Sequence, residues 1–166
     1  MDRNLTQGIL ELQLINSKSG EMRREKWTIN LSKPLTESFQ RFAEKSKVTG
    51  AGSGNAKKIM AERSVELVIN ALEDVALRFG VEIDGYAGCA SSVNYYTPDL
   101  YILYEGERFL SEVKSSGRKV SRPCLHLLKD ASSFGVYPSR ERYGAVRVNG
   151  NYGNSEPLTI QVCLQK

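Results

Sequence analysis

Three ionisable side chains, Asp99, Glu112 and Lys114, stand at the ends of two neighbouring apolar runs. The runs, residues 100–104 and 108–114, are separated by a Glu-Gly-Glu turn and are typical of a β-hairpin. Side chains two apart on a strand share a face, so Glu112 and Lys114 point the same way. Asp99 begins the partner strand and is expected alongside Glu112. Two carboxylates beside an ammonium on a rigid sheet predict a divalent-metal site suited to phosphodiester hydrolysis.

The elements that position these groups are predicted to form a mixed α/β core. A long helix is expected from about residue 56 to 79, with an apolar stripe that includes Phe79 and with Gly80 ending it. Further strands and a helix are expected around the hairpin. They comprise strands at about 81–86, 143–149 and 158–164, and a helix at about 123–133. This order predicts a mixed central sheet with helices packed against it.

The N-terminal part is predicted to be an extension of this core. Residues 8–31 alternate apolar and polar side chains around a polar turn and predict a hairpin. A short helix follows at about 36–45, with Thr36 as its N-cap. The chain is therefore divided into a hairpin-and-helix extension, a Gly-rich linker and a nuclease core. Their bounds are 1–47, 48–55 and 56–166.

Composition limits the function classes. The 166-residue chain has a net charge of +4 and a pI near 9.0, compatible with a polyanionic partner. It has no apolar run of membrane-spanning length, and its first residues lack the apolar core of a signal peptide. Its three cysteines are far apart and fit neither a disulfide framework nor a metal knuckle, so a reducing cytosol is expected. The single histidine, His126, excludes a His-rich zinc site and is expected to be a packed helix residue.

The motifs Pro98-Asp99 and Glu112-Val113-Lys114 resemble those of the PD-(D/E)xK nuclease superfamily. Within it the nearest likeness is to archaeal Holliday junction resolvases. Those proteins begin their core with a helix bearing Ala-Glu-Arg, as Ala61-Glu62-Arg63 does here, and end a later strand in Glu-x-Lys-Ser. The likeness covers about residues 55–135. It implies a restriction-endonuclease-like fold and a Mg²⁺-dependent endonuclease acting on DNA, with Mn²⁺ able to substitute, in the cytoplasm of a prokaryotic or virus-infected cell.

The resemblance also implies roles for single residues. Asp99, Glu112 and the backbone carbonyl of Val113 would hold the metal, and Lys114 would orient the attacking water. Glu62 would bind a second ion or a water of the first.

The position of Glu62 has its own basis in helical spacing. It lies three residues before Val65 and is therefore expected on the buried stripe of its helix. Glu66, one turn further on, remains a competitor, and a solvated acid is the alternative for either residue.

The remaining candidates flank the predicted site. The resolvases carry a functional serine in the corresponding loop, which points to Ser91 or Ser92, with a plain polar loop as the alternative. Tyr95 and Tyr96 could stack on bases or pack locally. Basic and polar residues that follow the site are expected to contact DNA; they are Ser115, Arg118, Lys119 and Arg122.

Three functions stay open at this point. Cutting a four-way junction needs two active sites on symmetric strands, so a resolvase would be a homodimer. A restriction-type or repair-type duplex endonuclease would instead need reader elements, for which the hairpin offers Lys18, Arg23, Arg24 and Lys26. A catalytically inactive nucleic-acid-binding module of the same fold is the third. The role of residues 1–47 stays open between a partner-docking module, an extra DNA contact and a dimer surface.

Overall fold

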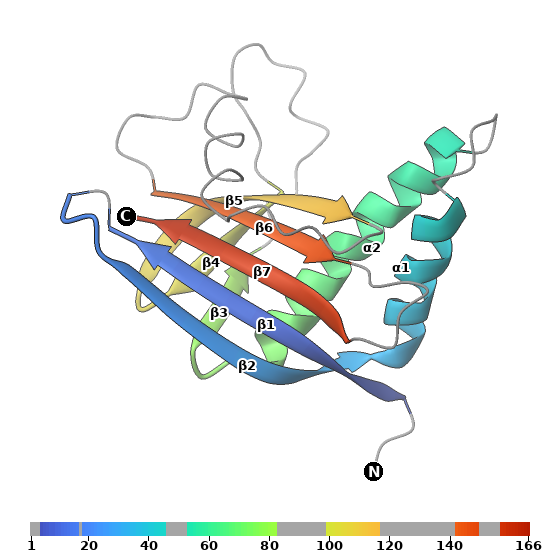
Figure 1. The fold of residues 1–166 in the computed structure, drawn as a ribbon, viewed down its shortest axis with the longest axis horizontal. Coiled ribbons are helices and arrows are strands. Elements are labelled where there is room, and N and C mark those ends of the chain that lie inside the picture. Colours follow the sequence, from blue (N-terminus) through green and yellow to red (C-terminus); the bar gives the residue numbers. More distant parts are fainter. Residues whose placement is uncertain (1–3, 17, 46–52, 83–98, 117–141, 150–156) are drawn as a thin grey trace.

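A seven-stranded mixed sheet dominates the computed structural model, in the order β2-β1-β7-β6-β5-β4-β3 (Figure 1). Both helices of the described part of the chain, α1 and α2, pack on one face of this sheet (Figure 1). The structure describes residues 4–16, 18–45, 53–82, 99–116, 142–149 and 157–166. The chain is thus α/β with a mixed sheet, as predicted.

The strands lie close to their predicted places. Their bounds are β1 Leu5–Ile15, β2 Met22–Ser32, β3 Phe79–Glu82, β4 Leu100–Tyr104, β5 Glu107–Ser116, β6 Arg142–Asn149 and β7 Leu158–Gln165. Strands β3, β4 and β5 form an antiparallel meander, β6 is parallel to β5, and β7 is antiparallel to β6. The helix expected at 123–133 lies outside the described residues.

The helix termini differ from the predictions. Helix α1 spans Lys33–Lys45, one turn earlier than expected, because Ser32 rather than Thr36 is its N-cap. The Ser32 hydroxyl accepts the Leu35 N–H at 3.3 Å, and the Thr36 hydroxyl donates to the Ser32 carbonyl at 2.9 Å.

Helix α2 spans Ser53–Asp74, so the expectation that Phe79 belongs to its apolar stripe is wrong. A turn at residues 75–78 redirects the chain, and Phe79 begins β3. There its ring, 3 % exposed, stacks on Tyr104 with centroids 4.8 Å apart. An aromatic residue suits a strand as well as a helix, so periodicity alone did not separate the two.

The N-terminal hairpin is part of the central sheet. Strand β1 pairs antiparallel with β2 on one side and parallel with β7 on the other, from Gly8↔Leu158 to Ile15↔Gln165. Buried residues of the hairpin and of α1, such as Leu10, Ile29 and Phe39, belong to the same core cluster as those of α2. The segment expected as an extension therefore completes the sheet. Most of the expected Gly-rich linker is not described, and α2 already begins at Ser53.

The sheet curls until its two edges meet. Trp27 on β2 touches Phe79 on β3 edge to face, with ring centroids 5.8 Å apart, although these strands stand at opposite ends of the strand order. Arg23 on β2 donates hydrogen bonds to the Tyr104 hydroxyl and, at 2.7 Å, to Glu105. Aromatic stacking and charge-assisted hydrogen bonds thus join the two edges.

Helix α2 covers the remaining free edge of β2. The backbone N–H groups of Asn30 and Ser32 donate to Asp74 Oδ2 at 2.9 Å and to Asn70 Oδ1 at 2.8 Å. Side chains of α2 therefore satisfy outward N–H groups that would otherwise be open to another strand.

Two expectations from composition can be compared with the structure. Among the described helices, none is long and apolar enough to cross a membrane. Cys163, fully buried on β7, is disulfide-bonded, so the expectation that the cysteines form no disulfide is wrong for this residue.

Candidate metal centre

The hairpin β4–β5 places Asp99 and Glu112 side by side on one face of the sheet. The antiparallel register pairs Leu100 with Ser111, and Asp99 precedes Leu100 directly, so it lies opposite Glu112. The Asp99 N–H donates to the Ser111 carbonyl at 3.1 Å, which extends the ladder by one bond. Opposed residues of an antiparallel pair have Cβ atoms about 4.5–5.5 Å apart. The register therefore places the two acidic side chains on one face of adjacent strands.

The turn of this hairpin fixes the register. Glu105 and Gly106 are its two central residues and have φ values of 51° and 77°. Positive φ at both positions characterises the two-residue hairpin turn whose twist matches that of the strands. Residues 109 and 113 then face the helices, where Phe109 is fully buried and Val113 packs on the core cluster. Alternation sends Glu112 and Lys114 to the opposite face, on which neither α1 nor α2 packs. With respect to these two described helices we call it the helix-free face.

One oxygen of Asp99 is engaged in a structural hydrogen bond. Its Oδ2 accepts the Val113 N–H at 2.8 Å, just where β4 no longer supplies a backbone acceptor to β5. Within the described part of the chain, Oδ1 accepts no hydrogen bond. The carboxylate is thus held by one oxygen and can offer the other to a ligand.

Glu112 is the more enclosed carboxylate. Its side chain is 14 % exposed, and its Oε1 lies 3.4 Å from Lys114 Nζ. Its Oε2 is buried and has no hydrogen-bond partner among the described residues. An unsatisfied buried carboxylate oxygen is costly in a structural role and is what a cation ligand requires.

Asp99 and Glu112 differ from ordinary surface acids in the pKa of their carboxyl groups. Burial raises the pKa of the Asp99 carboxyl above its usual range, partly offset by the Val113 N–H and the charge of Lys114. Burial likewise raises the pKa of Glu112, and the Lys114 ammonium opposes that shift through its charge and its hydrogen bond. Burial thus raises the free energy of the charged form of both acids, as is common for carboxylates at functional sites.

The oxygen donors fit a hard divalent cation. Mg²⁺ is commonly bound through one or two carboxylates, with waters and substrate phosphates completing its shell. No group of three or more His, Cys, Asp or Glu side chains that could hold a metal occurs among the described residues. The fit therefore rests on Asp99 and Glu112, with the Val113 carbonyl as the expected backbone donor.

Glu62 is not brought to this pair. It is exposed on α2, about half a helical turn away from the buried residues Met60 and Ser64. The expectation that it lies on the buried stripe is wrong, because α2 turns a different row of side chains to the sheet. Glu66 is also exposed and forms an ion pair with Arg63 at 2.9 Å. A metal-binding role for either acid stays a prediction.

Sequence reasoning missed Arg147. Strand β6 pairs it with Lys114, so the two cations lie side by side on the helix-free face. The Arg147 side chain is 4 % exposed, and its Nη1 donates to Gln161 Oε1 at 3.4 Å. A charge within the apolar run Ala145–Val148 was the available signal.

The other predicted site residues can be placed only in part. Ser115 lies on β5, half-buried, and alternation turns it to the helix-covered face rather than beside Lys114. The remaining candidates fall outside the described residues. They are Ser91, Ser92, Tyr95, Tyr96, Pro98, Arg118, Lys119, Arg122 and His126.

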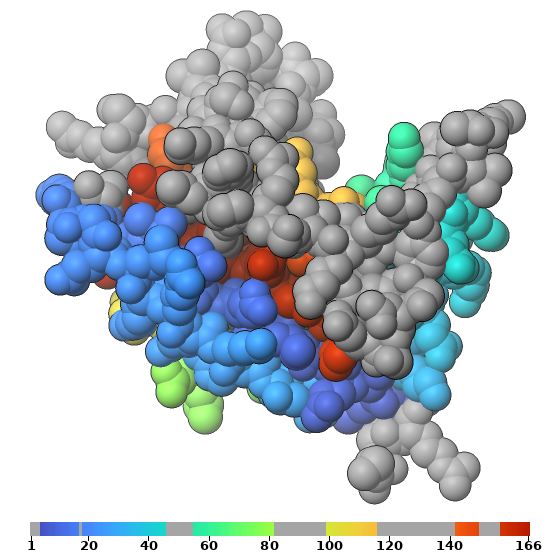
Figure 2. Space-filling view, viewed as in Figure 1, coloured from blue at the N-terminus to red at the C-terminus, as the bar shows by residue number. Residues whose placement is uncertain are grey.

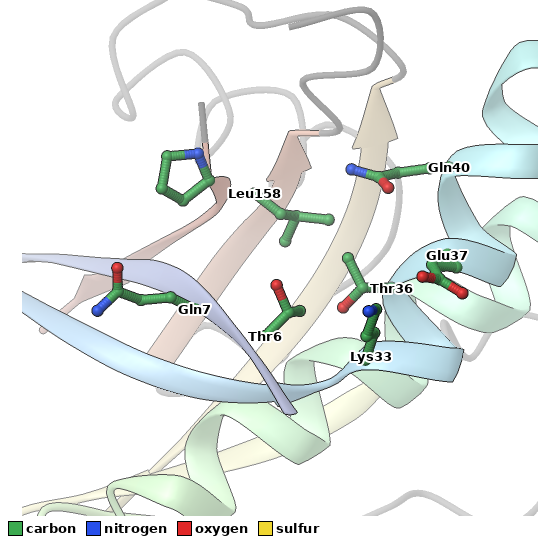
Figure 3. A pocket seen from close by; sticks show the side chains of 8 residues that line it. Thr6, Gln7, Lys33, Thr36, Glu37, Gln40 and Leu158 are labelled. Atoms are coloured by element: carbon green, nitrogen blue, oxygen red, sulfur yellow. The ribbon is translucent and has the colours of Figure 1, made fainter. Parts of the chain in front are cut away.

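A pocket of about 360 Å³ opens elsewhere, between β1, α1 and the start of β7 (Figure 3). Lys33, Glu37, Gln40 and Thr6 give it a polar lining (Figure 3). Among its described lining residues Glu37 is the one acid, so these residues do not offer the paired ligands of the candidate metal centre.

Comparison of the chain with protein-family models, with curated proteins and with solved structures finds no match.

Proposed function

We propose that this protein is a metal-dependent endonuclease that hydrolyses DNA phosphodiester bonds. The observation that carries the proposal is the placement of Asp99 and Glu112 on one face of adjacent strands, with Lys114 bonded to Glu112. Paired desolvated carboxylates can serve other purposes, but Glu112 Oε2, which is buried and has no hydrogen-bond partner in the described part of the chain, favours a cation ligand over a salt-bridge network.

The residues have distinct tasks. Asp99, Glu112 and the Val113 carbonyl would hold Mg²⁺, or Mn²⁺ in its place. The chemistry that such an ion would supply when bound is polarisation of the phosphodiester and a lower pKa of an attacking water. Lys114, about half exposed, orients that water and stabilises the charge that develops on the phosphate oxygens.

The order of elements supports the same proposal. Helix α2 precedes β3, Asp99 directly precedes β4, and Glu-Val-Lys-Ser lies near the end of β5. This is the order of the nuclease motifs that the sequence resembles. A restriction-endonuclease-like fold is the fold we propose on this basis. Branched DNA is the proposed substrate, and a homodimer would then present two centres to symmetric strands.

Two alternative functions can be compared with this proposal. A duplex endonuclease of the restriction or repair type would use the same centre with different DNA contacts. An inactive DNA-binding module would keep the fold without turnover, but DNA binding alone does not require an ammonium held beside two desolvated carboxylates.

Cleavage assays test the proposal. Purified protein is incubated with four-way junction, duplex, flap and single-stranded DNA in Mg²⁺, Mn²⁺ or EDTA. We expect cutting only with metal, fastest on the junction, and a dimer by light scattering.

The variants Asp99→Asn and Lys114→Ala should cut at least about 100-fold more slowly, because each removes a group acting on the reacting phosphate. Lys114→Ala should still bind DNA. Lys58→Ala, an exposed lysine on α2, is the matched control and should cut normally. Undiminished cutting by Asp99→Asn, or cutting in EDTA, would overturn the proposal.

A further inference from the structure

Arg147 of strand β6 lies next to the candidate metal centre, on the helix-free face. We propose that Arg147 is a positioning residue for the cleavage reaction, because its buried positive charge confines the Lys114 ammonium to the side of the carboxylates. This inference rests on the proposed function. It adds β6 to the strands that build the centre.

The strand register places Arg147 directly beside Lys114. Strands β5 and β6 are parallel, with Glu112 opposite Ala145 and Lys114 opposite Arg147. Neighbouring strands lie about 4.8 Å apart, and paired residues share a face. The β6 residue opposite Glu112 has only a methyl side chain, so the charge that β6 brings to this face stands next to Lys114.

Arg147 is enclosed and held in place. It is 4 % exposed, and its Nη1 donates to Gln161 Oε1 at 3.4 Å. The same oxygen accepts from Asn149 at 3.1 Å, and Gln161 Nε2 donates to Glu11 Oε2 at 3.1 Å. Gln161 and Glu11 belong to β7 and β1, whose atoms lie next to each other in Figure 2. Hydrogen bonds from three strands thus orient the guanidinium.

Lys114 is the more exposed of the two cations. Its side chain is about half exposed, and its Nζ lies 3.4 Å from Glu112 Oε1. Lysine has a flexible four-carbon stem, and an ion pair that is open to solvent contributes little to fixing such a chain. A further force on the ammonium would therefore improve the alignment that activation of the water needs.

Repulsion between like charges provides this force. A guanidinium stays protonated in proteins, so Arg147 bears a constant positive charge. Its hydrogen bond with Gln161 keeps that charge about one to two strand spacings, or about 5–10 Å, from Lys114. Burial weakens solvent screening over such a distance. The ammonium is therefore driven away from β6 and towards β4, where Asp99 lies opposite Glu112.

The same charge also acts on a cation bound by the carboxylates. A fixed positive charge nearby opposes the binding of Mg²⁺ or Mn²⁺, since like charges repel. Arg147 thus lowers the affinity for metal while it raises the rate of cutting. A residue needed only for folding would change both quantities in the same direction, so the opposite signs identify a positioning charge.

The variant Arg147→Met tests this inference, because it keeps most of the side-chain volume and removes the charge. At saturating DNA and Mg²⁺ its kcat should fall at least about fivefold. Its KM for DNA should stay unchanged, because a residue that is 4 % exposed does not reach the substrate. Calorimetric titration with Mn²⁺ in the absence of DNA should show binding that is about threefold tighter or more.

Two further variants separate the charge from the packing. Arg147→Lys retains the charge and should recover most of the wild-type kcat and Mn²⁺ affinity. Gln161→Leu removes a hydrogen-bond partner of the guanidinium but leaves its charge, so kcat should fall with a smaller change in Mn²⁺ affinity. Thr36→Val, which removes a hydroxyl from a residue on α1 that is 6 % exposed, is the buried control and should match wild type in kcat, KM and Mn²⁺ affinity.

Three results would overturn the positioning role while the proposed function stands. They are an unchanged kcat in Arg147→Met and Gln161→Leu, a raised KM for DNA, and a parallel loss of melting temperature, Mn²⁺ affinity and kcat that Arg147→Lys does not repair. If wild type neither binds Mn²⁺ nor cuts DNA, the proposed function fails and this inference fails with it.

Discussion

At the scale of single residues, the candidate centre depends on two carboxyl groups that are less hydrated than surface acids. Burial raises the pKa of both Asp99 and Glu112. A raised carboxyl pKa means that the unfolded chain releases these protons first as the pH rises. The free energy of unfolding therefore decreases as the pH rises from the ordinary carboxyl range, near pH 4, to the raised pKa values. Above these pKa values the folded protein bears the full free-energy cost of two partly buried charges, unless a bound cation offsets it.

This predicts that removing either charge stabilises the metal-free protein. Asp99→Asn and Glu112→Gln should raise the melting temperature in EDTA at pH 7.5 by a few degrees. Substitutions of functional residues often stabilise a protein in this way while they remove its activity. The gain should vanish near pH 3.5, where both states are protonated. Calorimetric melting across this pH range measures the effect.

Glu44→Gln is the control, since Glu44 is exposed on α1. It should melt as wild type does at both pH values. Loss of stability in Asp99→Asn and Glu112→Gln at pH 7.5 would show that these carboxylates act as structural bonds and not as strained ligands.

The residues of the centre were predictable because they depend on local geometry. Period-two alternation and one short turn fix the relation of Asp99, Glu112 and Lys114, and both can be read from 20 residues of sequence. The prediction that Glu62 is buried was wrong because its exposure depends on which side of α2 packs against the sheet and α1. Tertiary packing decides this, and the local sequence does not. Arg147 was missed because its neighbour Lys114 becomes visible only with the parallel β5–β6 register.

At the scale of elements, the β5–β6 contact controls the position of Glu112. Gly144 lies opposite Ser111, and Glu112 pairs with the next residue, Ala145. A Cβ atom at Gly144 would come within 2.4 Å of Ser111 Oγ and 3.0 Å of Leu164 Cδ2. A Cβ atom at this position would therefore crowd the Ser111 and Leu164 side chains, which lie on the neighbouring strands β5 and β7.

Gly144→Ala should push β6 away from β5. We expect a loss of about 1–3 kcal/mol in unfolding free energy, as for overpacked cores, together with weaker metal-dependent cutting. Denaturant unfolding and the cleavage assay measure the two effects. Gly80→Ala on the edge strand, where the nearest atom is Leu103 Cδ1 at 3.3 Å, should cost less. Equal losses in the two variants would contradict a special role for the β5–β6 spacing.

Element type was predictable where the pattern was strong, as in β1, β5 and residues 56–74 of α2. Element ends were less so. Ser32 caps α1 although Thr36 has an equally suitable side chain, and Phe79 leaves the helix because it can stack on Tyr104. Both outcomes depend on partners distant in sequence.

At the scale of the whole molecule, the N-terminal hairpin and the candidate centre belong to one curled sheet. The parallel β1–β7 pairing joins residues about 150 positions apart, so no local sequence pattern predicts it. The seam of Trp27, Phe79 and Tyr104 then closes the curl. Hence the class α/β was predictable from the sequence, whereas the integration of the first 45 residues was not.

The proposed activity depends on a divalent cation held between strands β4 and β5. Calorimetric titration with Mn²⁺ at pH 7.5 tests this most directly, on wild type, Asp99→Asn, Glu112→Gln and the Glu44→Gln control. We predict that wild type and control bind Mn²⁺ alike and that each centre variant binds at least about tenfold more weakly. Wild-type affinity in both centre variants would contradict the account.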